Sequence, residues 1–241
     1  MLQAAMWGAF AGSSILLGAL LGIYKEIPRK VLGFIMSFGT GVLIGAASFE
    51  LLRESVDDGG LVAASGGFIF GSLTFTVCEL LITKKGGSDR KRSKQNPENH
   101  SGVSIFIGTV IDAIPESVII GVSLLQENTV SFLMVTAVFI SNFPEGLSSS
   151  VGLRKDGYSK KKILFMWLIV LLLSSLSSFL GFSLLQNADT AVIAFIGAFA
   201  AGGIIAMVAS TMMPEAFEEG GPIVGLIASL GVLASLILSN L

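Results

Sequence analysis

Charged side chains are scarce in this sequence. Of its 241 residues, 13% are charged and 52% are hydrophobic, and the mean hydropathy is +0.81. A soluble domain of average composition is about one quarter charged. This difference predicts an all-α integral membrane protein, embedded in a lipid bilayer, rather than a water-soluble domain. The formal net charge of −2 gives no sign of a nucleic-acid partner.

Cysteine and histidine each occur only once. Cys78 alone cannot build a disulfide framework or a cysteine-rich zinc site, and its apolar surroundings indicate a small buried hydrophobic residue. His100 lies in a polar loop, so the chain lacks the pair of histidines that a zincin-type hydrolase uses. We therefore expect no enzymatic activity.

Eight apolar runs are long enough to cross a bilayer, for which a helix needs about 20 residues. Most of the polar breaks between them are short, which predicts antiparallel neighbours in one transmembrane domain over 1–241. The longest break, 83–102, contains glycine, serine and six basic residues, and we predict a cytoplasmic linker there. The predicted helices cover roughly 4–23, 31–52, 61–82, 103–125, 129–153, 163–185, 190–213 and 222–240.

The positions of lysine and arginine predict the orientation of these helices. Of the 15 basic residues, 14 lie in the first, third and fifth loops. Basic loops remain on the cytoplasmic side of a membrane. In a plasma membrane, both termini would then be extracytoplasmic. A helix count wrong by one would scatter the basic residues over both sides, so the pattern also favours eight helices.

Two distant segments of the chain resemble each other. Residues 38–62 align without a gap to residues 199–223, an offset of 161 (199 − 38). The predicted orientation gives the two copies opposite directions, as in the inverted repeats of secondary transporters. Chance similarity between glycine-rich membrane helices is the alternative. The repeat places Glu54 at the outer mouth and Glu215 at the inner mouth, where each would attract cations.

The fourth and fifth predicted helices each carry acidic residues near the middle of the membrane. The segments are DAIPES at 112–117 and SNFPEG at 141–146. One ionisable side chain at the bilayer centre costs about 2.5–3.5 kcal/mol, so a purely structural role does not account for three of them. Asp112 and Glu116 are four residues apart and share one helix face, and Ser141 and Glu145 repeat this spacing. If these faces pack together, three carboxylates converge.

Three adjacent carboxylates in a low dielectric need a counter-charge. No lysine or arginine lies inside a predicted helix, so a bound cation or protons must supply it. Pro115 and Pro144 each release a backbone carbonyl of the preceding turn and predict a kink beside the acidic residues. Kinked helices at this depth line cavities. The pattern therefore predicts a cation site at mid-membrane.

The paired motifs resemble those of the ZIP family of divalent-metal transporters. That family carries a histidine-asparagine-x-proline-glutamate-glycine pattern on its fourth helix and a related proline-glutamate-glycine pattern on its fifth. The resemblance covers essentially the whole chain. It implies a 3+2+3 arrangement, in which the first three and last three helices form an inverted repeat around a central metal-site pair. It also implies movement of the metal toward the cytoplasm.

The resemblance implies that Glu116 and Glu145 are metal ligands. Asp112 stands where the family has its fourth-helix histidine, and Asn142 matches a polar position of the fifth-helix motif. We expect one metal ion bound by these three carboxylates, with Asn142 or Ser141 assisting. The departures from the family pattern are Ala113, Ser117 and Ser141.

Ligand chemistry bears on which metal is carried. The family makes Zn²⁺ the default substrate, but an all-oxygen site lacks the imidazole or thiolate that favours zinc. This shifts the expectation toward Mn²⁺ or Fe²⁺, each as a transported substrate rather than a cofactor.

The residues leave several alternatives open. The first is a proton-linked or monovalent-cation carrier on the same scaffold. An intramembrane metallo-enzyme would need histidine ligands, and a non-transporting scaffold or receptor would leave the acidic residues unexplained. The sequence also leaves open whether the protein forms a homodimer.

Overall fold

The computed structural model describes residues 1–25, 27–82, 102–126 and 130–240, without the side chains of 102–105 and 126. These ranges contain helices and no strand. The predicted linker 83–102 and His100 lie outside the described residues, apart from Gly102 at the start of a helix. The elements are α1 (Leu2–Tyr24), α2 (Arg29–Ala46), η1 (Ala47–Leu52), α3 (Arg53–Ile82), α4 (Gly102–Gln126), α5 (Phe132–Lys155), α6 (Lys160–Leu185), α7 (Thr190–Met207), η3 (Val208–Met212), α8 (Met213–Gly220) and α9 (Val224–Leu238).

Within the described ranges, five helical stretches are long and apolar enough to cross a membrane. The longest has 53 residues and covers two of the predicted spans. The finding fits an all-helical membrane protein, and the count of eight spans stays a prediction. The five stretches are Leu2–Tyr24, Arg29–Leu81, Phe106–Leu125, Lys160–Leu185 and Thr190–Gly220.

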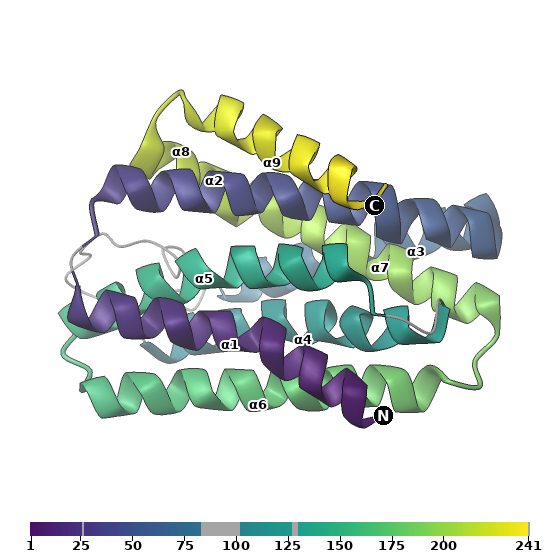
Figure 1. Ribbon diagram of the computed structural model, residues 1–241, viewed down its shortest axis with the longest axis horizontal. Coiled ribbons are helices and arrows are strands. Elements are labelled where there is room, and N and C mark those ends of the chain that lie inside the picture. The colour runs from purple at the N-terminus through teal and green to yellow at the C-terminus, as the bar shows by residue number, and fades with distance from the viewer. Residues whose placement is uncertain (26, 83–101, 127–129, 241) are drawn as a thin grey trace.

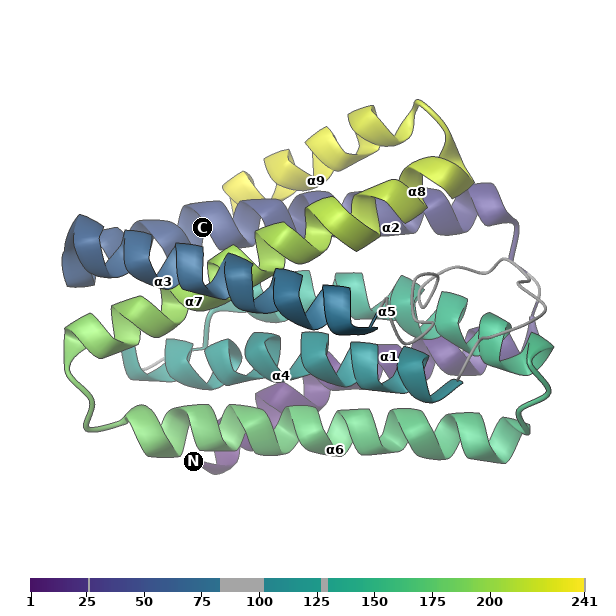
Figure 2. The same cartoon turned by 180° about the vertical axis from the view of Figure 1, so that it is seen from behind.

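A single glycine divides the 53-residue stretch. Gly60 has a φ of 76° and a ψ of 167°, a left-handed conformation that interrupts α3. Glycine adopts positive φ without the steric cost of a Cβ. Figure 2 shows the arm of α3 beyond this point folded back along α7.

The helices form two packed groups (Figures 1 and 2). In the first, α1 packs against α5 and α6, and α4 packs against α6. In the second, α3 packs against α7, and α2 packs against α9 and α8. The groups meet mainly where α2 contacts α5 and α4 contacts α7. The predicted cation site lies on α4 and α5, so it sits beside this boundary.

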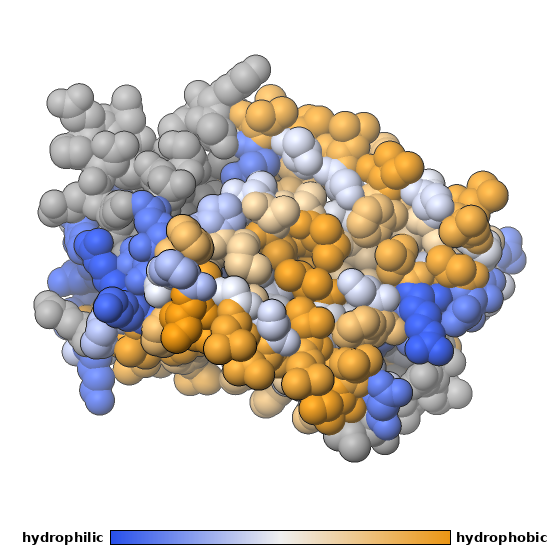
Figure 3. All heavy atoms as spheres, turned by 90° about the horizontal axis from the view of Figure 1, so that it is seen from above, coloured by the Kyte–Doolittle hydropathy of each residue, from blue (hydrophilic) through white to orange (hydrophobic). Residues whose placement is uncertain are grey.

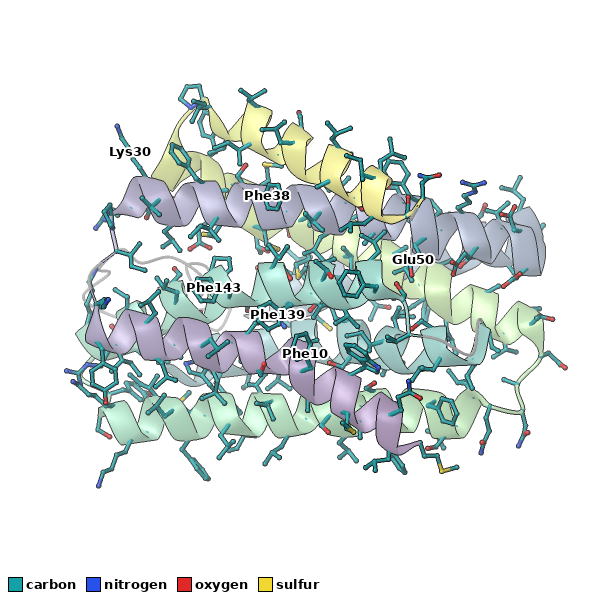
Figure 4. All side chains as sticks on the ribbon, in the orientation of Figure 1. Phe10, Lys30, Phe38, Glu50, Phe139 and Phe143 are labelled. Atoms are coloured by element: carbon teal, nitrogen blue, oxygen red, sulfur yellow. The ribbon has the colours of Figure 1, made fainter. Side chains whose placement is uncertain are left out.

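Small residues let the helices of the first group approach closely, as is usual between membrane helices. A Cβ on Gly18 would collide with the carbonyl oxygen of Phe143, and one on Gly146 with that of Ile15. On the same pair of helices, the rings of Phe10 and Phe139 stack with centroids 5.2 Å apart (Figure 4). These contacts fix α1 against α5 and so hold the motif on α5 in place.

On the face that Figure 3 shows, the surface is apolar along the middle and polar toward the two ends. Exposed leucines recur every four residues on α6, at 168, 172, 176, 180 and 184. At one end, the Lys160 ammonium lies 4.2 Å from the centre of the Tyr24 ring, which joins α6 to α1. Lys25, Arg29, Arg154 and Lys155 line one cavity at the same end. A belt of this kind is the surface that a bilayer-embedded protein presents to lipid.

The two segments that align in sequence, 38–62 and 199–223, share unusual backbone features. The π-helical segment η1 begins at Ala47 and η3 begins at Val208, an offset of 161 (208 − 47). Gly60 and Gly221 have φ of 76° and 74° at the same offset. Their packing is also alike, since a Cβ on Gly41 would collide with the carbonyl oxygen of Ala228, and one on Gly202 with that of Phe68.

Candidate metal site on α4 and α5

The five residues predicted as metal ligands are all buried. Each is at most 5% exposed. Two belong to α4 and three to α5, and each helix contains its proline within the motif. A proline inside a helix removes one backbone hydrogen bond. The predicted ligands are Asp112, Glu116, Ser141, Asn142 and Glu145.

One face of α4 carries three polar side chains in succession. Thr109, Asp112 and Glu116 are spaced by three and four residues, which places them within an arc of about 60° at 100° per residue. All three are buried, with Thr109 at 2% exposure. The face therefore presents a hydroxyl and two carboxylates to the neighbouring helices.

Asp112 and Glu116 line a cavity of about 60 Å³ between α3, α4 and α7. Its wall also includes Cys78 of α3 and Met207 of α7, together with apolar and small residues. Thiol and thioether sulfur are soft ligands, whereas carboxylates are hard ones. The cavity thus joins both ligand types beside the boundary between the two helix groups.

Glu145 reaches the same face of α4 by a different contact. Its Oε1 accepts a hydrogen bond of 2.9 Å from the Thr109 hydroxyl. Ser141, one turn earlier on α5, donates its hydroxyl to the carbonyl of Val138 at 3.1 Å and keeps its oxygen lone pairs. Glu145 is therefore held against α4 one turn from Asp112.

The structure does not gather the three carboxylates into one closed ligand set. Among the described residues, no group of three or more His, Cys, Asp or Glu side chains is close enough together to hold a metal ion. Asp112 and Glu116 share the cavity, whereas Glu145 does not line it. The expected convergence is thus limited to a shared face of α4, and the ligand set stays a prediction.

Sequence reasoning missed three residues beside the predicted ligands. Thr109 precedes Asp112 by three positions, and this helical spacing was the available signal. Cys78 was interpreted as a buried hydrophobic residue, but it is half-buried and lines the cavity with Asp112. Met207 comes from α7, and no sequence pattern linked it to α4.

Glu215 was expected at the rim of the inner mouth, and the structure corrects this position. The helical path of α7 continues through η3 into α8, so Glu215 lies within a helix. It is 3% exposed, and its Oε1 accepts a hydrogen bond of 3.0 Å from the hydroxyl of Ser148 on α5. Asp57 and Asp58, which follow Glu54 on α3, are exposed.

Comparison with known proteins bears on this site. A family model described as ZIP Zinc transporter matches residues 83–234, a range that includes both motifs. The chain is 28% identical over 209 residues, 86% of its length, to a putative zinc transporter of Arabidopsis thaliana. It is 25% identical over 144 residues, 58% of its length, to the zinc transporter ZupT of Salmonella heidelberg. These matches cover 33% and 46% of the two relatives, so the chain spans less than half of either.

Proposed function

Because the chain belongs to the ZIP zinc transporter family, we propose that it carries a divalent metal cation across the membrane toward the cytoplasm. The family and the relatives are named for transport and not for an enzymatic reaction, in agreement with the expectation of no enzymatic activity. Zn²⁺ is the first candidate substrate because the relatives are named as zinc transporters. Fe²⁺ and Mn²⁺ follow from the oxygen-rich set of proposed ligands.

We further propose eight spans with both termini outside the cell. The break at Gly60 separates the second span from the third within Arg29–Leu81. Basic residues gather where α1 meets α2 and α5 meets α6, and such residues favour the cytoplasmic side. Figure 1 shows both chain ends away from this basic end.

The arrangement we propose for these spans is an inverted repeat around α4 and α5. Its support is the shared offset of the two π-helical segments and of the two glycines with positive φ. π-helical segments are rare and frequently occur at functional sites. Because η1 and η3 occupy equivalent positions in the two repeats, they would let the helices of the second group bend on either side of the proposed metal site.

The metal would be bound by Asp112, Glu116 and Glu145, with Asn142 or Ser141 assisting. The observation that carries this proposal is the contact between the motif of α5 and the polar face of α4, in which Thr109 donates to Glu145. Carboxylate oxygens bind divalent cations well, and a cation lowers the cost of burying several carboxylates together.

The test is metal uptake into proteoliposomes. Glu116→Gln and Glu145→Gln remove one charge each with little change in shape, and each should abolish uptake of Zn²⁺ and Mn²⁺. Asp189→Asn, at an exposed position, is the matched control and should transport at the wild-type rate. Size-exclusion profiles establish that each variant is folded.

Two outcomes would contradict the proposal. Wild-type uptake by Glu116→Gln or Glu145→Gln would show that the site is wrong. Proton or sodium flux that depends on Glu145 and proceeds without any divalent metal would identify the chain as a proton-linked or monovalent-cation carrier.

A further inference from the structure

Glu215 is a buried carboxylate that the proposed central site does not use. Its hydrogen-bond donor, Ser148, is itself fully buried and lies on α5 three residues after Glu145. Residues three apart share a helix face and are separated by about 4.5 Å along the axis. Two buried glutamates, one from α5 and one from α8, therefore reach neighbouring positions on one face of α5.

Ser149 adds a further oxygen at this place. It follows Glu145 by four residues, so it lies on the same side of α5. Its side chain is 1% exposed, and its hydroxyl has no hydrogen-bond partner among the described atoms. A buried hydroxyl without a partner is costly unless a ligand or water satisfies it. The hydroxyl of Ser148 thus contacts Glu215, and the buried hydroxyl of Ser149 lies one turn from Glu145 on the same helix.

The repeat gives Glu215 an equivalent at the other end of the protein. Glu54 precedes it by 161 (215 − 54) and lines a cavity with Ile119 of α4. The motifs of α4 and α5 align at a spacing of 29, which matches Ile119 with Ser148 (148 − 119). Each of the two glutamates therefore faces the same position of the central helix pair. Glu50, one turn before Glu54, lines the same cavity. Figure 4 shows Glu50 and Lys30 toward opposite ends of the protein.

The neighbours of Glu215 indicate on which side of the membrane this residue lies. Glu219, four residues later on α8, lies 4.0 Å from the guanidinium of Arg29. Arg29 lines the basic cavity at the end of the protein that we assign to the cytoplasm. Glu215 is thus one helical turn inside that end, between the central site and the cytoplasmic surface.

We propose that Glu215 is a second cation-binding residue on the exit path, where the metal is bound by the Glu215 carboxylate and the hydroxyls of Ser148 and Ser149 before release. The proposal rests on the transport function proposed above. A cation leaving several carboxylates in a low dielectric loses a large attraction. A single carboxylate one turn away offsets part of this loss, yet binds weakly enough to let the ion leave.

The first test separates rate from affinity in proteoliposome uptake. Glu215→Gln should lower the maximal rate about tenfold or more with little change in KM, because metal capture from outside is unaffected. Glu218→Gln, exposed on the same helix, is the control and should match the wild type. Equal maximal rates for the two variants would overturn the proposal.

The second test detects the metal without transport. In a Cys78→Ala background, the thiol that Ser148→Cys introduces should react with a small methanethiosulfonate reagent, and Cd²⁺ should slow this reaction. Adding Glu215→Gln should remove the protection by Cd²⁺, while adding Glu218→Gln should leave it. A thiol that never reacts, or protection that survives Glu215→Gln, would overturn the proposal.

The two proposals can fail separately. If Glu116→Gln transports normally but Cd²⁺ protection still depends on Glu215, the central site is wrong and the exit residue stands. If Glu116→Gln abolishes uptake while Glu215→Gln behaves as Glu218→Gln does in both tests, only the exit residue is wrong.

Discussion

The hydroxyl of Thr109 donates a hydrogen bond of 2.9 Å to the carboxylate of Glu145, and both side chains are buried. This bond joins the motif of α5 to the polar face of α4. A hydrogen bond to a charged group contributes about 1.5–3 kcal/mol, roughly the energy of a tenfold change in an equilibrium constant or more. Thr109 therefore positions Glu145 toward the residues that we propose bind the metal.

Thr109→Val should lower metal uptake about tenfold, because it keeps the shape of the side chain and removes the donor. Thr109→Ser keeps the hydroxyl and should retain most of the activity. Thr76→Val, exposed on α3, is a matched control in which the lost bond lies within one helix. Radiotracer uptake per folded protein measures the effect, and equal uptake by the two valine variants would contradict it.

Two adjacent glycines of α7 should respond in opposite ways to alanine. A Cβ on Gly202 would collide with the carbonyl oxygen of Phe68, whereas the nearest atom to one on Gly203 is the carbonyl oxygen of Gly71 at 3.9 Å. Gly202→Ala should therefore separate α7 from α3 and cost about 1–3 kcal/mol or more. Gly203→Ala should be neutral or stabilise by about 0.5–1 kcal/mol, because alanine favours the helix.

Thermal unfolding of the purified protein in detergent measures this difference directly. The melting temperature of Gly202→Ala should fall well below that of Gly203→Ala. Equal melting temperatures would show that α3 and α7 do not pack as closely in solution as they do here.

Replacement of the lone cysteine should change which metal is preferred. Cys78 lines the same cavity as Asp112 and Glu116, so a metal in this cavity has a soft ligand within its walls. Cys78→Ser replaces sulfur by oxygen and should lower uptake of Zn²⁺ relative to Mn²⁺ severalfold. Competition between the two metals in proteoliposomes measures the ratio. A ratio equal to that of the wild type would mean that the thiol does not contact the transported ion.

The motifs and the helices around them were predictable because both depend on local spacing. The four-residue interval between Asp112 and Glu116 places them on one face of any helix, and both line one cavity. The resemblance to the ZIP family, drawn from the two motifs, is confirmed by the match over 83–234. The bounds of several helices also lie within a few residues of those expected, as at α6 over Lys160–Leu185, but the predicted break before 61–82 is helical because α3 begins at Arg53.

The contacts between helices were not predictable in the same way. Glu215 lies in the break after the predicted helix 190–213 and was expected in a loop, but the backbone continues as a helix and buries it against Ser148. Thr109 carries no motif of its own and gains its role from Glu145, 36 residues away. The convergence of three carboxylates was inferred from helix faces alone, and the described residues do not form such a group.

The sequence by itself determined the membrane class, the helical segments and the two acidic motifs, since hydropathy and residue spacing act along a single helix. Only the tertiary structure decided which side chains meet across helices, as Glu145 meets Thr109 and Glu215 meets Ser148. The physical reason is that interhelical contacts depend on the rotation and depth of each helix. The glycines that pack closely recur at a four-residue spacing, as Gly41 and Gly45 do, but this spacing does not say which helix packs against them.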